Sequence, residues 1–113
     1  MTDILPVYIL IRTSKRPVFF SQMMETIKNQ TYPNIITIVH TDDPADTYVS
    51  GDIIIRGERL KKSPQMTAPY NLYNNTLLRS IPDGEGWYHF IDDDDLYAAP
   101  DVIEKLVKYS RRE

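Results

Sequence analysis

Four consecutive aspartates, Asp92 to Asp95, form the densest group of chemically active side chains in the sequence. Adjacent carboxylates repel one another, so a fold that gathers them needs a nearby counter-charge. Carboxylate oxygens are ligands for hard cations such as Mg²⁺ and Mn²⁺, which commonly share their coordination shell with phosphate groups. A solvated acidic loop is the plainer alternative. The aspartates directly follow the apolar pair Phe90 and Ile91, however, and this favours a site at the end of a strand.

Two more polar segments follow apolar runs in the same way. Residues 13–16 come after the apolar run 7–11, and residues 41–43 come after the apolar run 35–39. In an open sheet of parallel strands, the carboxyl ends of the strands meet at one edge, and ligands bind there. We therefore expect both segments to converge with the four aspartates.

The elements that must hold these segments alternate between strand and helix. Continuous apolar runs predict buried strands, and apolar residues at helical spacing predict amphipathic helices. The predicted strands are residues 7–11, 35–39, 52–56 and 87–91. The predicted helices are residues 17–30, residues 70–81, and a last helix that Pro100 opens, with Val102, Ile103, Leu106 and Val107 on its apolar side. Because strands separated by helices require crossovers, the predicted fold class is α/β, with a Rossmann-like, mostly parallel sheet and flanking helices.

Composition narrows the class of protein further. A length of 113 residues predicts a single domain, residues 1–113. The absence of cysteine excludes a disulfide scaffold and thiolate metal sites, and it fits a reducing compartment, so we expect a cytoplasmic protein. The net charge of −3 argues against a nucleic-acid partner. The longest apolar run, eight residues from Ile4 to Ile11, is too short for a membrane span.

Other common phosphate-binding and metal-binding patterns are missing or weak. The four glycines form neither G-x-G-x-x-G nor a Walker loop, so nicotinamide cofactors and P-loop chemistry are not expected. His40 and His89 favour structural roles, because neither has a second histidine at ligand spacing. A basic group is equally compatible with a solvated loop and with phosphate contacts; its members are Arg56, Arg59, Lys61 and Lys62.

Several short motifs, in this order and spacing, resemble the N-terminal, donor-binding half of a family 2 glycosyltransferase of the GT-A fold. The first strand is followed by Thr13 to Pro17 (TSKRP), and the first helix by Gln30 to Asn34 (QTYPN). Asn75 then precedes Gly86 to Asp95 (GWYHFIDDDD), which is similar to the strand and Asp-x-Asp element of that family. The resemblance covers nearly the whole chain.

The resemblance implies a site for a nucleoside diphosphate sugar, with a uridine nucleotide as the first expectation, and a glycan or other hydroxyl group as acceptor. Thr13 and Arg16 would line the nucleoside pocket. Asp42 would contact the base or the ribose, and Thr41 replaces the first of the family's two aspartates at this point, which puts the identity of the base in question.

The same resemblance assigns roles within the acidic run. Asp92 and Asp94 would bind Mn²⁺ or Mg²⁺, and Asp92 or Asp93 would meet the ribose or the metal shell. The ion would neutralise the diphosphate as the glycosidic bond breaks. The expected function is therefore metal-assisted glycosyl transfer from a nucleotide sugar to an acceptor hydroxyl.

Two alternatives stay open at this point. In the resembled family, the general base and most acceptor contacts belong to a C-terminal half, and this sequence stops at Glu113. We therefore expect the acceptor part to be missing, and a catalytically silent nucleotide or nucleotide-sugar binding module is the alternative function. A phosphotransfer receiver domain is disfavoured. Such a domain requires a pair of acidic residues after the first strand, and this sequence has Arg12 and Thr13 there.

Overall fold

The computed structural model describes residues 4–57 and 70–110 and alternates strands with helices. The elements, in chain order, are β1 (Val7–Thr13), α1 (Pro17–Lys28), β2 (Ile35–Thr41), β3 (Ile53–Arg56), α2 (Tyr70–Arg79), β4 (Trp87–Asp92) and α3 (Val102–Ser110). The predicted α/β class with a parallel sheet is thereby confirmed. Strands β1, β2 and β4 each run one or two residues further than predicted, to the polar residues at their ends.

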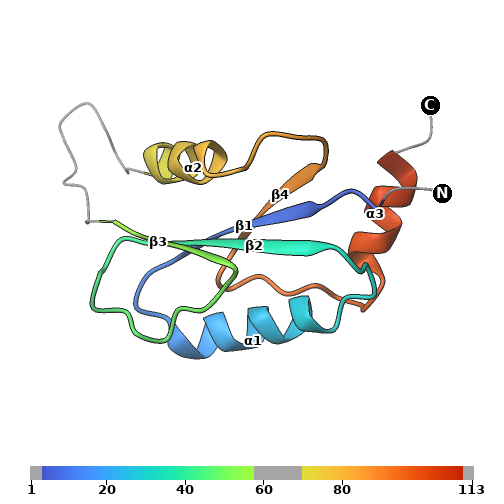
Figure 1. Cartoon of the computed structure of the whole chain (residues 1–113). Coiled ribbons are helices and arrows are strands. Elements are labelled where there is room, and N and C mark those ends of the chain that lie inside the picture. Colours follow the sequence, from blue (N-terminus) through green and yellow to red (C-terminus); the bar gives the residue numbers. More distant parts are fainter. Residues whose placement is uncertain (1–3, 58–69, 111–113) are drawn as a thin grey trace.

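The four strands form one sheet in the order β3-β2-β1-β4, and every neighbouring pair is parallel. Helix α1 covers one face of the sheet and α2 lies over the other (Figure 1). Val7 of β1 is in register with Ile35 of β2 and with Trp87 of β4. Because all strands point the same way, the segments that follow them leave the sheet from one edge, as expected.

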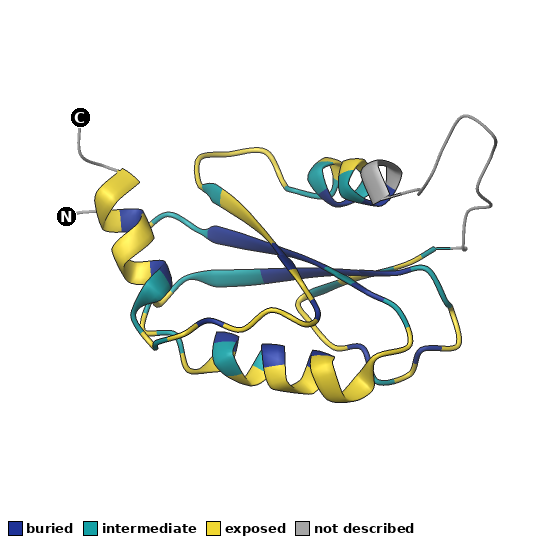
Figure 2. Ribbon diagram, turned by 180° about the vertical axis from the view of Figure 1, so that it is seen from behind, coloured by how far each residue is buried: buried dark blue, intermediate teal, exposed yellow. Residues whose placement is uncertain are grey.

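The apolar core is divided by the sheet into two layers. Side chains of β1 alternate between the layers, because successive residues of a strand point to opposite faces. On the α1 side, Ile9 and Ile11 pack in one cluster with Phe20 and Met23. On the α2 side, Tyr8 and Leu10 pack with Ile38 and Leu77. Strand β1 is buried along nearly its whole length (Figure 2), which explains its continuous apolar run.

Strand β4 is mostly exposed, with Ile91 as its one buried residue. Ile91 is buried on the α1 side, whereas Tyr88 and Phe90 on the α2 side are 57% and 38% exposed. Helix α2 packs mainly on β1 and β2, and β4 is largely exposed in the described part of the chain (Figure 2). The apolar pair Phe90 and Ile91 is therefore split between solvent and core.

The last helix differs from its prediction at two points. It begins at Val102 rather than at Pro100, after a turn. Ile103 and Val107 are buried as predicted, but the assignment of Leu106 to the apolar side is wrong, because its side chain is 49% exposed. The helix buries only a narrow stripe beside the turn between α1 and β2, where the Ile103 N–H donates to the side-chain oxygen of Gln30 at 3.0 Å. Within the described residues, no helix has the length and apolar character needed to cross a membrane.

Candidate functional site

A pocket of about 460 Å³ opens at the carboxyl edge of the sheet. Its walls include every residue that the sequence analysis assigned to a ligand or metal, namely Thr13, Arg16, Asp42, Asp92, Asp93 and Asp94. Three segments far apart in the sequence therefore meet there: the turn after β1, the end of β2, and the turn after β4. Arg12, His40 and Tyr73 also line the pocket, and the sequence analysis gave them no role in it.

The register of β1 and β4 sets the first contacts in the pocket. Arg12 lies opposite Asp92, and their side chains form a salt bridge of 3.0 Å on the α2 side of the sheet. One residue further along, Thr13 Oγ1 donates a hydrogen bond of 2.9 Å to the Asp93 carboxylate on the other side. Neighbouring aspartates thus have different surroundings, since Asp92 is exposed and Asp93 is buried.

Asp93 is the most buried residue of the acidic run. It is 5% exposed, and this burial raises the pKa of Asp93. The hydrogen bond from Thr13 and the positive charge of Arg16 act in the opposite direction, because both favour the ionised carboxylate. The Arg16 guanidinium lies 3.6 Å from Asp93 and 3.5 Å from Asp94. Arg12 and Arg16 together are therefore the counter-charge that the run of aspartates requires.

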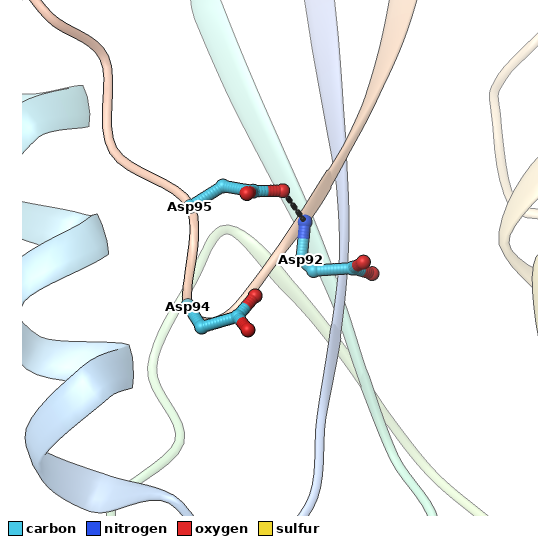
Figure 3. Close-up of side chains that lie close together, drawn as sticks. All are labelled: Asp92, Asp94 and Asp95. Carbon is cyan, nitrogen blue, oxygen red and sulfur yellow. Dashed lines mark hydrogen bonds between the residues drawn. The ribbon is translucent and has the colours of Figure 1, made fainter.

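The remaining aspartates form a small cluster in the turn after β4. One carboxylate oxygen from each of Asp92, Asp94 and Asp95 lies within 4.8 Å of the others. The Asp95 carboxylate accepts a hydrogen bond from the Asp92 N–H at 3.1 Å, which closes the turn (Figure 3). An all-oxygen, exposed donor set of this kind fits Mg²⁺ or Mn²⁺ rather than a softer metal. Asp95 therefore joins the two predicted ligands as a third candidate.

Asp46 ties the first two pocket segments together. This buried carboxylate accepts hydrogen bonds from Thr41 Oγ1 at 2.7 Å and from the Lys15 N–H at 3.1 Å. Lys15 has a φ of 55°, a left-handed backbone conformation that residues other than glycine rarely adopt. Asp46 compensates for this strain by binding the Lys15 amide. The sequence analysis missed Asp46, because it lies in an irregular loop where no periodicity marks it.

His40 and Tyr73 form the wall of the pocket beside Asp42. The His40 and Tyr73 rings pack with centroids 4.8 Å apart, and the Tyr73 hydroxyl lies 3.5 Å from an Asp42 carboxylate oxygen. Burial lowers the pKa of His40, Asp42 opposes the shift, and Arg12 adds to it. The imidazole is therefore mainly neutral at pH 7. A histidine at the polar end of a buried strand was the signal in the sequence for this position.

His89 and Arg56 are described by the structure and are not among the residues that line the pocket. His89 Nδ1 is hydrogen-bonded to the Tyr97 hydroxyl at 2.8 Å, and burial lowers the pKa of His89. Arg56 donates to the backbone carbonyl of Asp46 at 2.6 Å. The other members of the basic group, Arg59, Lys61 and Lys62, fall outside the described residues.

In comparisons with known proteins, no protein-family model matches this sequence, and no curated protein is similar enough to it to count as a match.

Proposed function

We propose that this chain binds a nucleoside diphosphate sugar together with Mn²⁺ or Mg²⁺, as the donor-binding part of a family 2-like glycosyltransferase. The observation that carries the proposal is the meeting of the TSKRP turn, Asp42 and the acidic run around one pocket. Such an edge is the usual ligand site of a parallel α/β sheet. The volume of about 460 Å³ lies within the range of small-molecule sites.

The charges around the pocket support a diphosphate with a cation. Asp92 and Asp94 would hold the ion, with Asp95 beside them, and the ion would neutralise the charge on the diphosphate. Arg12 and Arg16 each pair with one of these carboxylates, at 3.0 Å and 3.5 Å, so both guanidinium groups would be close to a diphosphate bound by the ion. Guanidinium groups bind phosphate oxygens well because their N–H donors match them in geometry and charge.

Binding without transfer is the second candidate function, and one observation favours it. After Asp95, the acidic residues in the described part of the chain are Asp101 and Glu104. Asp101 pairs with Lys105 at 3.2 Å, and Glu104 accepts a hydrogen bond from Thr31 at 2.6 Å. Neither lines the pocket, so this segment supplies no general base near an acceptor.

Calorimetric titration with UDP in the presence and absence of Mn²⁺ tests the proposal. We expect Mn²⁺ to raise the affinity at least tenfold in the unmodified chain, and Asp94→Asn to abolish this increase. Asp101→Asn is the matched control, because it removes a carboxylate that is 43% exposed, against 52% for Asp94, and that does not line the pocket. Equal heats with Mn²⁺ and with EDTA would contradict the metal role. The absence of binding to any nucleoside diphosphate would contradict the proposal as a whole.

A further inference from the structure

His40 is a buried polar side chain in the pocket wall whose hydrogen-bonding capacity is not used. Its residue is 3% exposed, and its Nδ1 atom is buried without a hydrogen-bond partner in the described part of the chain. An unsatisfied buried nitrogen is costly, and nearly all such atoms in folded proteins have a partner. A ligand in the pocket is a natural source of that partner, because His40 belongs to the pocket wall.

The imidazole is held in a defined position by its neighbours. The Tyr73 ring packs over it at a centroid distance of 4.8 Å, tilted by 32°. On another side the chain passes at Gly57, where a Cβ atom would lie 3.1 Å from His40 Nε2. Glycine at this position therefore leaves room for the ring.

The pocket wall carries both fully charged groups and a neutral ring. Arg12, Arg16 and the carboxylates of Asp92 and Asp94 offer full charges, which suit a diphosphate and a cation. His40, Asp42 and Tyr73 lie together in the same wall. A neutral imidazole suits an uncharged partner, because it presents one N–H donor and one nitrogen acceptor and no net charge. The edge of a nucleobase offers such neutral donors and acceptors.

We propose that His40 recognises the nucleobase, through a hydrogen bond from its Nδ1 atom to the edge of the base beside Asp42. This inference rests on the proposed function and adds a specificity-determining residue to it. It predicts that His40 contributes to the binding of a nucleotide and contributes nothing to the binding of a bare diphosphate.

Paired substitutions separate the polar group from the shape of the side chain. His40→Phe keeps a ring and removes both nitrogens, whereas His40→Asn keeps a polar atom close to the position of Nδ1. Affinities are measured by calorimetry in Mn²⁺ for UDP, CDP, GDP, ADP and inorganic pyrophosphate. For the nucleotide that binds most tightly, we expect His40→Phe to lower the affinity about tenfold and His40→Asn to lower it by less than about threefold. Pyrophosphate should bind all three proteins equally.

Nuclear magnetic resonance of the unmodified chain provides a second measurement that does not depend on the folding of a variant. The ¹⁵N signal of His40 Nδ1 should shift when the nucleotide is added and stay in place when pyrophosphate is added. An unshifted signal, or a nucleotide affinity that is the same in His40→Phe as in the unmodified chain, overturns the inference and leaves the proposed function standing. A chain that binds neither nucleotides nor pyrophosphate overturns the proposed function itself.

Discussion

Thr13 and Asp93 are hydrogen-bonded although they lie 80 positions apart in the sequence, with 2.9 Å between Thr13 Oγ1 and an Asp93 carboxylate oxygen. The Tyr48 hydroxyl lies 2.8 Å from the same Thr13 oxygen. One hydroxyl group thus joins the end of β1, the loop after β2 and the turn after β4. The position of the pocket walls relative to one another depends on this small group.

Replacing Thr13 with valine should therefore destabilise the protein. Thr13→Val keeps the shape of the side chain but leaves the buried Asp93 carboxylate without this donor, so we expect a loss of roughly 1–3 kcal/mol in the free energy of unfolding. Urea denaturation measures this loss. Thr31→Val is the control, because the Thr31 hydroxyl bonds to Glu104 at an exposed site. Equal losses in the two variants would show that Thr13 has no special role.

The substitution Asp42→Ala should weaken nucleotide binding and leave the fold intact. Asp42 is half-buried in the pocket wall, so losing its hydrogen bonds to a base or ribose should cost on the order of 1–3 kcal/mol in the free energy of UDP binding. Calorimetry measures this cost, with the exposed residue Asp83, changed to alanine, as the control. A large fall in the melting temperature of the Asp42 variant without ligand would instead assign Asp42 a structural role.

Stability should fall as the pH is lowered through the range in which histidine titrates. Burial lowers the pKa of His40 and of His89 below the ordinary value of 6.5. The unfolded chain therefore takes up protons that the folded chain resists, and the free energy of unfolding decreases from about pH 7.5 to about pH 5.5. The double variant His40→Asn, His89→Asn should show a smaller decrease in urea denaturation. An identical pH dependence would mean that neither histidine is responsible.

Glycosyl transfer by the 113 residues alone should be very slow or absent. In the proposed function, donor binding would need Asp42 and the acidic run, whereas transfer would also need a base beside the acceptor hydroxyl. A product assay with Mn²⁺, several nucleotide sugars and simple glycosides measures transfer, and slow hydrolysis of the donor by water is compatible with the prediction. Rapid transfer that survives Asp94→Ala would contradict the proposed donor site and the expectation that residues 1–113 hold no base beside an acceptor.

The elements of the fold were predictable because their apolar patterns are simple. The continuous run in β1 and the spacing of Phe20, Met23 and Ile27 in α1 reflect full burial and one-sided burial, respectively. Exposure at an edge was not predictable. Phe90 and Leu106 are as apolar as core residues, and they are exposed because no element in residues 4–57 and 70–110 covers them, which depends on strand order and helix placement.

The meeting of the polar segments at one pocket was predictable, but several residues of the pocket, such as Arg12, His40 and Tyr73, and the pairing of its side chains were not. The sequence predicted that the polar segments meet at one edge of the sheet. Which aspartate of the acidic run is exposed and which is buried depends on the register between β1 and β4. Because Arg12 lies opposite Asp92, the salt bridge forms on one face of the sheet, and Thr13 meets Asp93 on the other. A shift of one residue would exchange the exposed aspartate with the buried one. No local pattern in the sequence encodes that register.

The central position of β1 also determines when the sheet can be completed during synthesis. Strand β1 leaves the ribosome before β2, β3 and β4, and its pairing with β2 can form early, because the pairing of Val7 with Ile35 requires only a short length of chain. Its other side has to wait for β4, because Val7 also pairs with Trp87. Pairing of such distant segments slows folding, and an apolar strand with an open side is prone to aggregate in the meantime. The nascent chain therefore passes through a stage in which its most apolar strand has one unpaired edge, and the acidic turn after β4 is assembled only when that stage ends.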